Sequence, residues 1–222
     1  MKMEIENMVG SKLFEGFEKD DYQTLYSFLQ PTIERLEKGQ DLILEGETLE
    51  FMGIVCSGRL TGIKHDYGGN THLMQMMEKG DLFGIEIVAT NSRVSPITIT
   101  SVEESTILKF HKNCLSQQGA LPPEMQIRVL TNAVRFLAND NIKKIYKMDM
   151  LASKSLRGRI LTHLYLMHGK AKKSTFSIRM TREQFAQYLC VNRSALSHEL
   201  GLMKKEGMIS FKKDVFTLHF MD

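Results

Sequence analysis

Four side chains in the last quarter of the chain have the types and the spacing that reading a DNA duplex requires. They are Arg193, Ser194, Ser197 and His198, at the amino-terminal end of a helix that the sequence predicts over residues 193–206. Arginine can donate two hydrogen bonds to the acceptors of guanine, and serine or histidine can take one base edge or a phosphate. We therefore expect these residues to read bases in the major groove.

Other polar and basic side chains surround this group. Contacts to phosphates fix how a protein sits on a duplex, and they come mostly from lysine, arginine and hydroxyl side chains. The residues that we expect to meet phosphates around the groove are Thr181, Arg182, Lys204, Lys205, Lys212 and Lys213.

Two short helices, predicted at residues 182–189 and 193–206, would position these side chains. Ala186 falls where the two helices cross, a place that admits only a small side chain. The signals that start and stop the helices are a capping box of Thr181 with Gln184, an amino-terminal cap at Asn192 and a stop at Gly207. This pattern predicts a helix-turn-helix.

The flanking segments complete a small basic domain. A helix is expected at residues 156–167 with its end at Gly169, then a strand candidate at 176–180. After the helix-turn-helix, two alternating runs at 209–211 and 215–220 predict a hairpin, which would form a wing.

The charge of the chain is also unequal between this domain and the rest of the sequence. The 222 residues hold 29 Lys and Arg against 26 Asp and Glu, a net charge of +3. Residues 1–149 carry −5, however, and residues 150–222 carry +8. A helical hairpin with a solvated basic face is the alternative to a DNA-binding domain, but it leaves this concentration of positive charge unexplained.

The preceding part of the chain predicts a β-rich domain. An amphipathic helix is expected at residues 13–29, and short β-rich runs punctuated by glycine follow from about 32 to 118. Many short strands at regular spacing indicate an antiparallel roll or barrel.

One long helix is predicted to open at Pro122-Pro123, and no glycine or proline follows up to Met148. Its apolar residues step by three and four, with one polar member, as in the seam of a two-stranded coiled coil. The expected dimer seam is Ile127, Leu130, Val134, Leu137, Asn141, Ile145 and Met148. The alternative is that this stripe packs on the chain's own roll, but a second stripe of Val129, Ala133 and Phe136 is available for that contact.

At this point the sequence resembles the cAMP receptor protein/FNR (Crp/Fnr) family of bacterial transcription regulators, from about residue 13 to 220. The most specific segment is TREQFAQYLCVNRSALSHEL at residues 181–200, and the roll glycines Gly39, Gly46, Gly58, Gly80 and Gly84 are similar too. The resemblance implies that Arg193 is the base-reading arginine. Family members more often have other residues at Cys190, Ser194 and His198, so the operator sequence is not carried over.

The resemblance also points to an effector pocket, for which the candidates are Gly84, Glu86, Arg93, Lys144 and Ile145. Three differences from the cAMP-binding members of the family make cAMP a disfavoured ligand. One residue separates Gly84 from Glu86, the run around Arg93 lacks the family's Arg-Ser-Ala form, and Lys144-Ile145 replace the hydroxyl residues that meet adenine.

No cofactor is identified from the sequence. The three cysteines Cys56, Cys114 and Cys190 cannot supply four thiolates for an iron–sulfur cluster, and we expect small buried fillers or inert thiols there. The scattered histidines give no metal site, although His65, His72 or His111 leave haem ligation open. Met74, Met76 and Met77 could line an apolar effector pocket, but Met74 and Met76 lie on one strand face, which favours a role in filling the core.

Together these features predict an α+β protein: an N-terminal antiparallel β-roll that resembles a cyclic-nucleotide-binding jelly roll (1–120), a dimerisation helix (121–149) and a C-terminal winged helix-turn-helix (150–222). We expect a cytoplasmic homodimer that binds double-stranded DNA at an inverted repeat, under a small effector in the roll. We expect no enzyme and no membrane partner, and RNA polymerase as a partner for an activator. The alternative is a ligand-binding roll that regulates a partner protein through a basic docking domain.

Overall fold

The structure is a computed structural model that describes residues 2–114 and 121–219. Its contacts divide the chain into two compact units. The first unit holds residues 1–65 and 74–141, and the second holds residues 66–73 and 142–222. The two domain boundaries expected above, after residues 120 and 149, stay a prediction.

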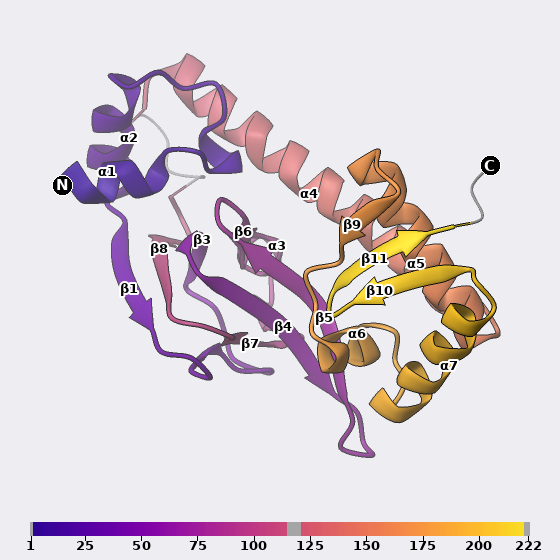
Figure 1. The fold of residues 1–222 in the computed structure, drawn as a ribbon. Helices are drawn as coiled ribbons and strands as arrows, with labels where there is room; N and C mark the ends of the chain where they lie inside the picture. The colour runs from indigo at the N-terminus through magenta and orange to yellow at the C-terminus, as the bar shows by residue number, and fades with distance from the viewer. Residues whose placement is uncertain (1, 115–120, 220–222) are drawn as a thin grey trace. The chain divides into compact units, whose positions relative to one another are not determined.

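Two antiparallel sheets form the β-roll (Figure 1). One sheet has the strand order β1-β8-β3-β6 and the other has the order β2-β7-β4-β5. The strands are β1 (Thr32–Leu36), β2 (Asp41–Ile43), β3 (Phe51–Ser57), β4 (Arg59–His65), β5 (Thr71–Glu78), β6 (Leu82–Phe83), β7 (Thr98–Ser101) and β8 (Ser105–His111). This confirms the roll predicted from the spacing of the short strands.

Apolar side chains from both sheets fill the interior of the roll. Val55 of β3, Leu60 of β4, Ile99 of β7 and Ile107 of β8 are each fully buried in one cluster. Met74, in contrast, is 43% exposed, so the expectation that it fills the core is wrong. The inward face of β5 carries Leu73 and Met77 instead, because alternate side chains of a strand point to opposite faces.

Gly53 is required where Phe83 crosses β3. A Cβ atom built on Gly53 would lie 2.2 Å from the Cζ atom of the Phe83 ring and 2.9 Å from the carbonyl oxygen of Leu108. No side chain fits in that space, since real Cβ contacts do not become so short. The Phe83 ring therefore occupies part of the roll interior at this position.

A second apolar cluster joins one sheet to the helices of the first unit. Met52 and Ile54 of β3 lie in this cluster, while their neighbour Val55 lies in the roll interior, so β3 is buried on both faces. The helices are α1 (Lys2–Met8), the 3-10 turn η1 (Lys12–Phe14), α2 (Asp21–Leu29) and α3 (Ile85–Val88).

The single helix expected at residues 13–29 is wrong. Gly16 has a φ of +80° and separates η1 from α2, a conformation that interrupts a right-handed helix. The apolar spacing across this break arises because Phe14 and Leu25 are both buried in the same core cluster from two separate elements.

The long helix α4 (Pro123–Ala152) is continuous over 30 residues. Val129, Ala133 and Phe136 are buried in the core cluster of the first unit, as expected for the stripe that faces the roll. Asn132 lies beside this stripe, and its Nδ2 atom donates to the carbonyl oxygens of Leu13 at 3.0 Å and Glu15 at 2.9 Å. These two hydrogen bonds link the segment around η1 to the long helix, a contact that the apolar pattern did not predict.

The second unit is a small α+β domain. Beyond the last turns of α4 it contains α5 (Leu156–Ala171), β9 (Thr175–Ser177), α6 (Arg182–Tyr188), α7 (Arg193–Lys205), β10 (Ile209–Lys212) and β11 (Val215–Leu218), with the sheet order β10-β11-β9. The predicted stop of α5 at Gly169 is wrong by two residues. Lys172, with a φ of +51°, is the left-handed cap instead.

Of the helices in the described ranges, none combines the length and the apolar composition that crossing a membrane requires.

Candidate nucleic-acid interface

Helix α6 begins at the predicted capping box. The Thr181 hydroxyl oxygen accepts from the backbone N–H of Gln184 at 3.2 Å, and the Gln184 side-chain oxygen accepts from the backbone N–H of Thr181 at 2.9 Å. These reciprocal bonds satisfy two donors that a helix start would otherwise leave without partners. They fix the start of the helix and with it the position of Arg182, the first residue of α6.

The turn between α6 and α7 is compact because of a left-handed residue. Cys190 has a φ of +55°, and the backbone N–H of Val191 donates to the carbonyl oxygen of Ala186 at 3.0 Å. Ala186 and Leu189 are buried, as the helix crossing requires. Cys56 and Cys114 are buried, as expected for small fillers. Cys190 is exposed, so the buried filler is wrong at this position and the inert thiol stays a prediction.

Helix α7 begins at Asn192, whose Oδ1 atom accepts from the backbone N–H of Ala195 at 2.9 Å and from the Ser194 hydroxyl at 3.0 Å. The buried side of the helix is formed by Leu196, Leu200 and Met203. The four predicted base-reading residues are all on the solvent side, and each is exposed: Arg193, Ser194, Ser197 and His198. The structure thus brings these four together in the first two turns of one helix.

The predicted phosphate-binding residues lie at the start of α6, in the last turn of α7 and on the wing. Thr181, Lys204, Lys205, Lys212 and Lys213 are exposed, and Arg182 is half-buried. Lys212 ends the first wing strand and Lys213 follows it in the turn, with a φ of +55°.

The cations predicted to contact DNA differ from those of the first unit in their partners. In the first unit, arginines and lysines pair with carboxylates, as in Arg59–Glu78, Lys64–Glu45, Arg93–Glu50, Lys109–Glu34 and Arg135–Glu15. Over residues 2–114 and 121–219, no carboxylate pairs with Arg182, Arg193, Lys204, Lys205, Lys212 or Lys213. A group of positive charges without acidic partners is what a polyanion would meet.

Arg182 lies close enough to Arg193 for the two charges to interact. Burial lowers the pKa of Arg182 from its ordinary value, and the positive charge of Arg193 lowers it further. Arginine nevertheless keeps its proton at any physiological pH. An anion bound here would relieve the repulsion between these guanidinium groups.

Arg157 links α5 to the recognition helix α7. Its Nε atom lies 2.6 Å from Glu199 Oε1, and its Nη1 and Nη2 atoms donate to the two oxygens of Glu206 at 2.7 and 2.9 Å. The two carboxylates raise the pKa of Arg157. Sequence reasoning missed this contact, because more than 40 residues separate the arginine from its partners.

Arg159 makes a second link, between the start of α5 and the helix-turn-helix. Its Nε atom donates to the carbonyl oxygen of Ser153 at 3.1 Å, and its Nη1 atom donates to that of Leu189 at 3.2 Å. The carbonyl of Leu189 ends α6. One side chain therefore ties the loop after α4 to the turn that precedes α7.

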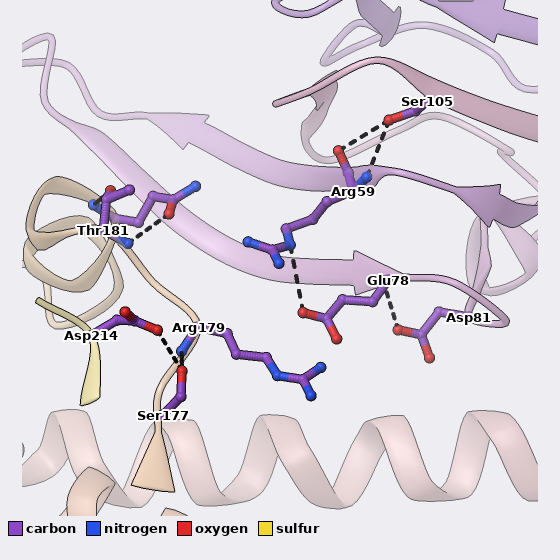
Figure 2. A network of polar contacts seen from close by, with 9 residues as sticks. Arg59, Glu78, Asp81, Ser105, Ser177, Arg179, Thr181 and Asp214 are labelled. Atoms are coloured by element: carbon purple, nitrogen blue, oxygen red, sulfur yellow. Dashed lines mark hydrogen bonds and ion pairs between the residues drawn. The ribbon is translucent and has the colours of Figure 1, made fainter. Parts of the chain in front are cut away.

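The wing is held to the segment before α6 by polar contacts, seen in the lower left of Figure 2. The Ser177 hydroxyl donates to Asp214 Oδ2 at 2.5 Å and accepts from the backbone N–H of Arg179 at 3.0 Å. Asp214 lies in the turn between β10 and β11, so this contact fixes the wing turn. The same figure also shows Arg59 paired with Glu78 in the roll, where Arg59 and Ser105 are also hydrogen-bonded.

The core of the second unit contains a buried histidine without a hydrogen bond. His163 is 4% exposed, and neither ring nitrogen has a partner in the described structure. Its ring centre lies 5.3 Å from that of Phe185 and 5.1 Å from that of Tyr188. Burial lowers the pKa of His163 to about 4, and the charges of Lys170 and Lys147 act in the same direction.

The expected dimer seam is exposed along α4. Ile127 and Val134 are each 65% exposed and Met148 is 64% exposed. Leu130, Asn141 and Ile145 are exposed as well, and Leu137 is half-buried. Burial therefore separates the two stripes in the way that the spacing predicts, with the seam left open to a partner.

Three candidate effector residues lie in the first unit. Gly84 precedes α3 with a φ of +76°, and Glu86 lies in the first turn of that helix. The Nη1 atom of Arg93 lies 2.6 Å from Glu50 Oε1, and Lys112 pairs with the other oxygen of Glu50. The hydrogen bond from Lys112, together with the charge of Arg93, holds the pKa of Glu50 below its ordinary value.

The other two effector candidates, Lys144 and Ile145, are exposed on the part of α4 that belongs to the second unit. The structure therefore describes the five candidates in separate units. No group of three or more His, Cys, Asp or Glu within the described ranges is arranged to hold a metal ion.

Comparison with protein families finds two matches. Residues 33–118 match the model of the cyclic nucleotide-binding domain, and residues 158–221 match that of the Crp-like helix-turn-helix domain. The second match includes the whole α6–α7 motif and the wing.

Curated proteins with similar sequences are regulators. The cyclic AMP receptor protein of Thermus thermophilus is 22% identical over 203 residues, which cover 91% of this chain and 89% of that protein. The fumarate and nitrate reduction regulatory protein of Vibrio cholerae is 24% identical over 199 residues, 86% of this chain and 77% of the relative.

Solved structures with the same fold include two further regulators. The c-di-GMP responsive global regulator CLP of Xanthomonas campestris superposes with a TM-score of 0.73 at 17% identity, over 89% of this chain and 98% of that one. The catabolite activator protein of Thermus thermophilus gives a TM-score of 0.55 at 18% identity, over 94% of each chain.

Proposed function

Because the chain is a transcription regulator of the Crp/Fnr family, with a cyclic nucleotide-binding domain and a Crp-like helix-turn-helix, we propose that it binds an inverted-repeat operator as a homodimer. In this proposal helix α7 of each protomer enters the major groove. The observation that carries it is the exposed amino-terminal end of α7, together with cations of α6, α7 and the wing that have no carboxylate partner in the described part of the chain.

The proposed base reader is Arg193, with Ser194, Ser197 and His198 beside it. Their exposure in the first two turns of α7 supports this assignment, since recognition helices contact bases with their amino-terminal residues. Arg193 would donate to guanine O6 and N7, and the other three would each take one base edge or a phosphate.

The exposed apolar seam of α4 supports the homodimer. A seam of this length, exposed in the single chain and broken by Asn141, is suited to a second copy in parallel register. The two α7 helices of such a dimer would enter successive major grooves, about 34 Å apart, and the operator would then be an inverted repeat.

We further propose that a small effector other than cAMP acts through the roll. The match of residues 33–118 supports the location, and the pairing of Arg93 with Glu50 disfavours a cyclic phosphate, because the guanidinium would have to leave a carboxylate first. The names of the relatives point to different nucleotides, cyclic AMP for one and c-di-GMP for another, so the fold does not determine the ligand. If the protein activates transcription, RNA polymerase is the expected partner.

Selection from a random pool of duplex DNA tests the central proposal. The full-length protein should enrich a two-fold symmetric sequence, and its affinity should fall steeply with salt as lysine and arginine release counterions. Native mass spectrometry of the freshly purified protein, run in parallel, would identify a retained effector. Failure to enrich any sequence, with and without the retained effector, would overturn the proposal.

A further inference from the structure

Two cations from different helices converge on one aromatic ring of the wing. Phe211 lies on β10, and the Cζ atom of Arg182 lies 4.8 Å from the centre of its ring. The Nζ atom of Lys204 lies 5.5 Å from the same ring centre. Arg182 begins α6 and Lys204 lies in the last turn of α7, so the ring joins the two ends of the helix-turn-helix.

The ring itself is held in place by the core. Phe211 is paired with Phe216 across β10 and β11, and their ring centres are 5.5 Å apart. Phe216 is fully buried, and its ring centre lies 6.1 Å from that of Phe185 in α6. Phe211 is therefore the half-exposed outer member of an aromatic cluster whose inner members, Phe216 and Phe185, are buried in the core.

Electrostatics alone would keep the two cations apart. Neither Arg182 nor Lys204 pairs with a carboxylate in the described part of the chain, and Arg193 adds a third positive charge near Arg182. The negative face of an aromatic ring attracts cations without neutralising them. The ring can therefore hold both side chains in place and leave their charges available to an anion.

We propose that Phe211 is a positioning residue for the DNA backbone: its ring orders Arg182 and Lys204 so that both meet phosphates beside the groove that α7 reads. This inference rests on the proposed function. Ordering a long, flexible side chain costs free energy on binding, and a site that has already ordered it avoids much of that cost. Phe211 would therefore strengthen binding to any duplex without altering which sequence is preferred.

The test compares Phe211→Leu with Phe211→Tyr in the full-length protein, by fluorescence anisotropy on the selected operator and on an unrelated duplex. Leucine keeps an apolar side chain but has no aromatic face, whereas tyrosine keeps the face. We expect F211L to lower affinity for both duplexes by about threefold to tenfold and to reduce the salt slope by up to two phosphates, each worth about 0.9. F211Y should restore both values.

A double-mutant cycle separates this role from simple filling of the wing. Lys204→Gln removes a cation at the ring. The neighbouring Lys205→Gln removes an exposed cation of the same helix that contacts no aromatic ring within the described residues. The effect of F211L should shrink in the K204Q background and stay unchanged in the K205Q background.

Three results would overturn the inference. They are wild-type affinity and salt slope in F211L, no recovery in F211Y, or equal effects of F211L in the K204Q and K205Q backgrounds. If the wild-type protein bound no duplex at all, the proposed function would fail first, and the inference with it.

Discussion

Arg157 grips Glu206 with both terminal nitrogens of its guanidinium, at 2.7 and 2.9 Å, and so ties the start of α5 to the residue that ends α7. Its third nitrogen reaches Glu199 in the middle of α7. The planar fork of arginine matches a carboxylate in a way that lysine cannot. Glu199 and Glu206 are seven residues apart and share one face of the helix, so the contact joins α5 to that face over two turns.

Arg157→Lys should therefore weaken operator binding although it keeps the positive charge. The single ammonium of lysine can pair with one carboxylate, but it cannot bind both oxygens of Glu206 and also reach Glu199. Helix α7 should therefore become less well ordered. Operator affinity measured by anisotropy should fall for R157K and further for R157A, with a smaller loss on unrelated DNA. The nearby exposed Lys154→Arg is the matched control and should bind as the wild type does.

Arg193→Ala should relax specificity. If the guanidinium contacts a guanine on both acceptors, its loss costs about 1–3 kcal/mol on the operator and little on unrelated duplex. Competition binding with the two duplexes measures the loss of affinity for the operator and the loss for unrelated DNA. Equal losses on the two would show that Arg193 meets a phosphate, and the assignment as a base reader would be wrong.

Val134→Glu should disrupt the proposed dimer. Val134 is 65% exposed in the single chain, so the substitution leaves the protomer's fold intact. In a dimer it would remove roughly 1.5–3 kcal/mol of apolar burial per protomer and bury a carboxylate without a partner. Sedimentation equilibrium should give a monomer for V134E and a dimer for Asn139→Glu, which is exposed on the same helix outside the seam.

Asn141→Leu tests the register of the same seam. A single polar residue in an apolar seam fixes alignment and oligomeric state at a cost in stability. We expect N141L to form a more stable assembly with altered stoichiometry and weaker operator binding. An unchanged sedimentation profile together with unchanged DNA binding would place the seam elsewhere.

His163 should make the stability of the protein depend on pH. Its pKa is lowered from 6.5 to about 4, so the unfolded chain takes up a proton below pH 6.5 that the folded chain resists until about pH 4. Above pH 6.5 His163 is neutral in both states and does not lower the free energy of unfolding. As the pH falls from 6.5 to 4, its protonation in the unfolded chain lowers the free energy of unfolding by about 3 kcal/mol in total.

Urea unfolding from pH 7 to 4 measures this effect. Carboxylates also titrate in that range, so the informative quantity is the difference between variants. His163→Phe keeps an aromatic ring between Phe185 and Tyr188, and its unfolding free energy should fall less steeply than that of the wild type. His168→Gln, which changes a half-buried histidine of the same helix, should keep the wild-type slope. Parallel curves for H163F and the wild type would contradict the prediction.

Local signals predicted the helix-turn-helix well. The capping box at Thr181, the cap at Asn192 and the left-handed Gly207 are each decided by residues within four positions, and the structure confirms all three. The division of α4 into a buried and an exposed stripe also followed from periodicity alone, because a helix repeats its faces every three to four residues.

Contacts between distant residues could not be predicted in this way. Arg157 and Glu206 are 49 positions apart, and only the folded chain brings them together. The break at Gly16 was missed because buried side chains on both sides of it imitate one helical stripe. Apolar residues lie on both faces of β5, and the sequence favoured the face of Met74 and Met76 as the core face. In the folded roll Leu73 and Met77 are buried instead, and Met74 is exposed.

The hydrogen bond from Ser194 to Asn192 limits what the proposed operator can be. A serine hydroxyl has one hydrogen, and here it is already donated to Asn192 Oδ1. As long as that bond is kept, Ser194 can only accept, and in the major groove the donors are the amino groups of adenine and cytosine. The base opposite Ser194 should then be adenine or cytosine, while guanine and thymine offer it only acceptors.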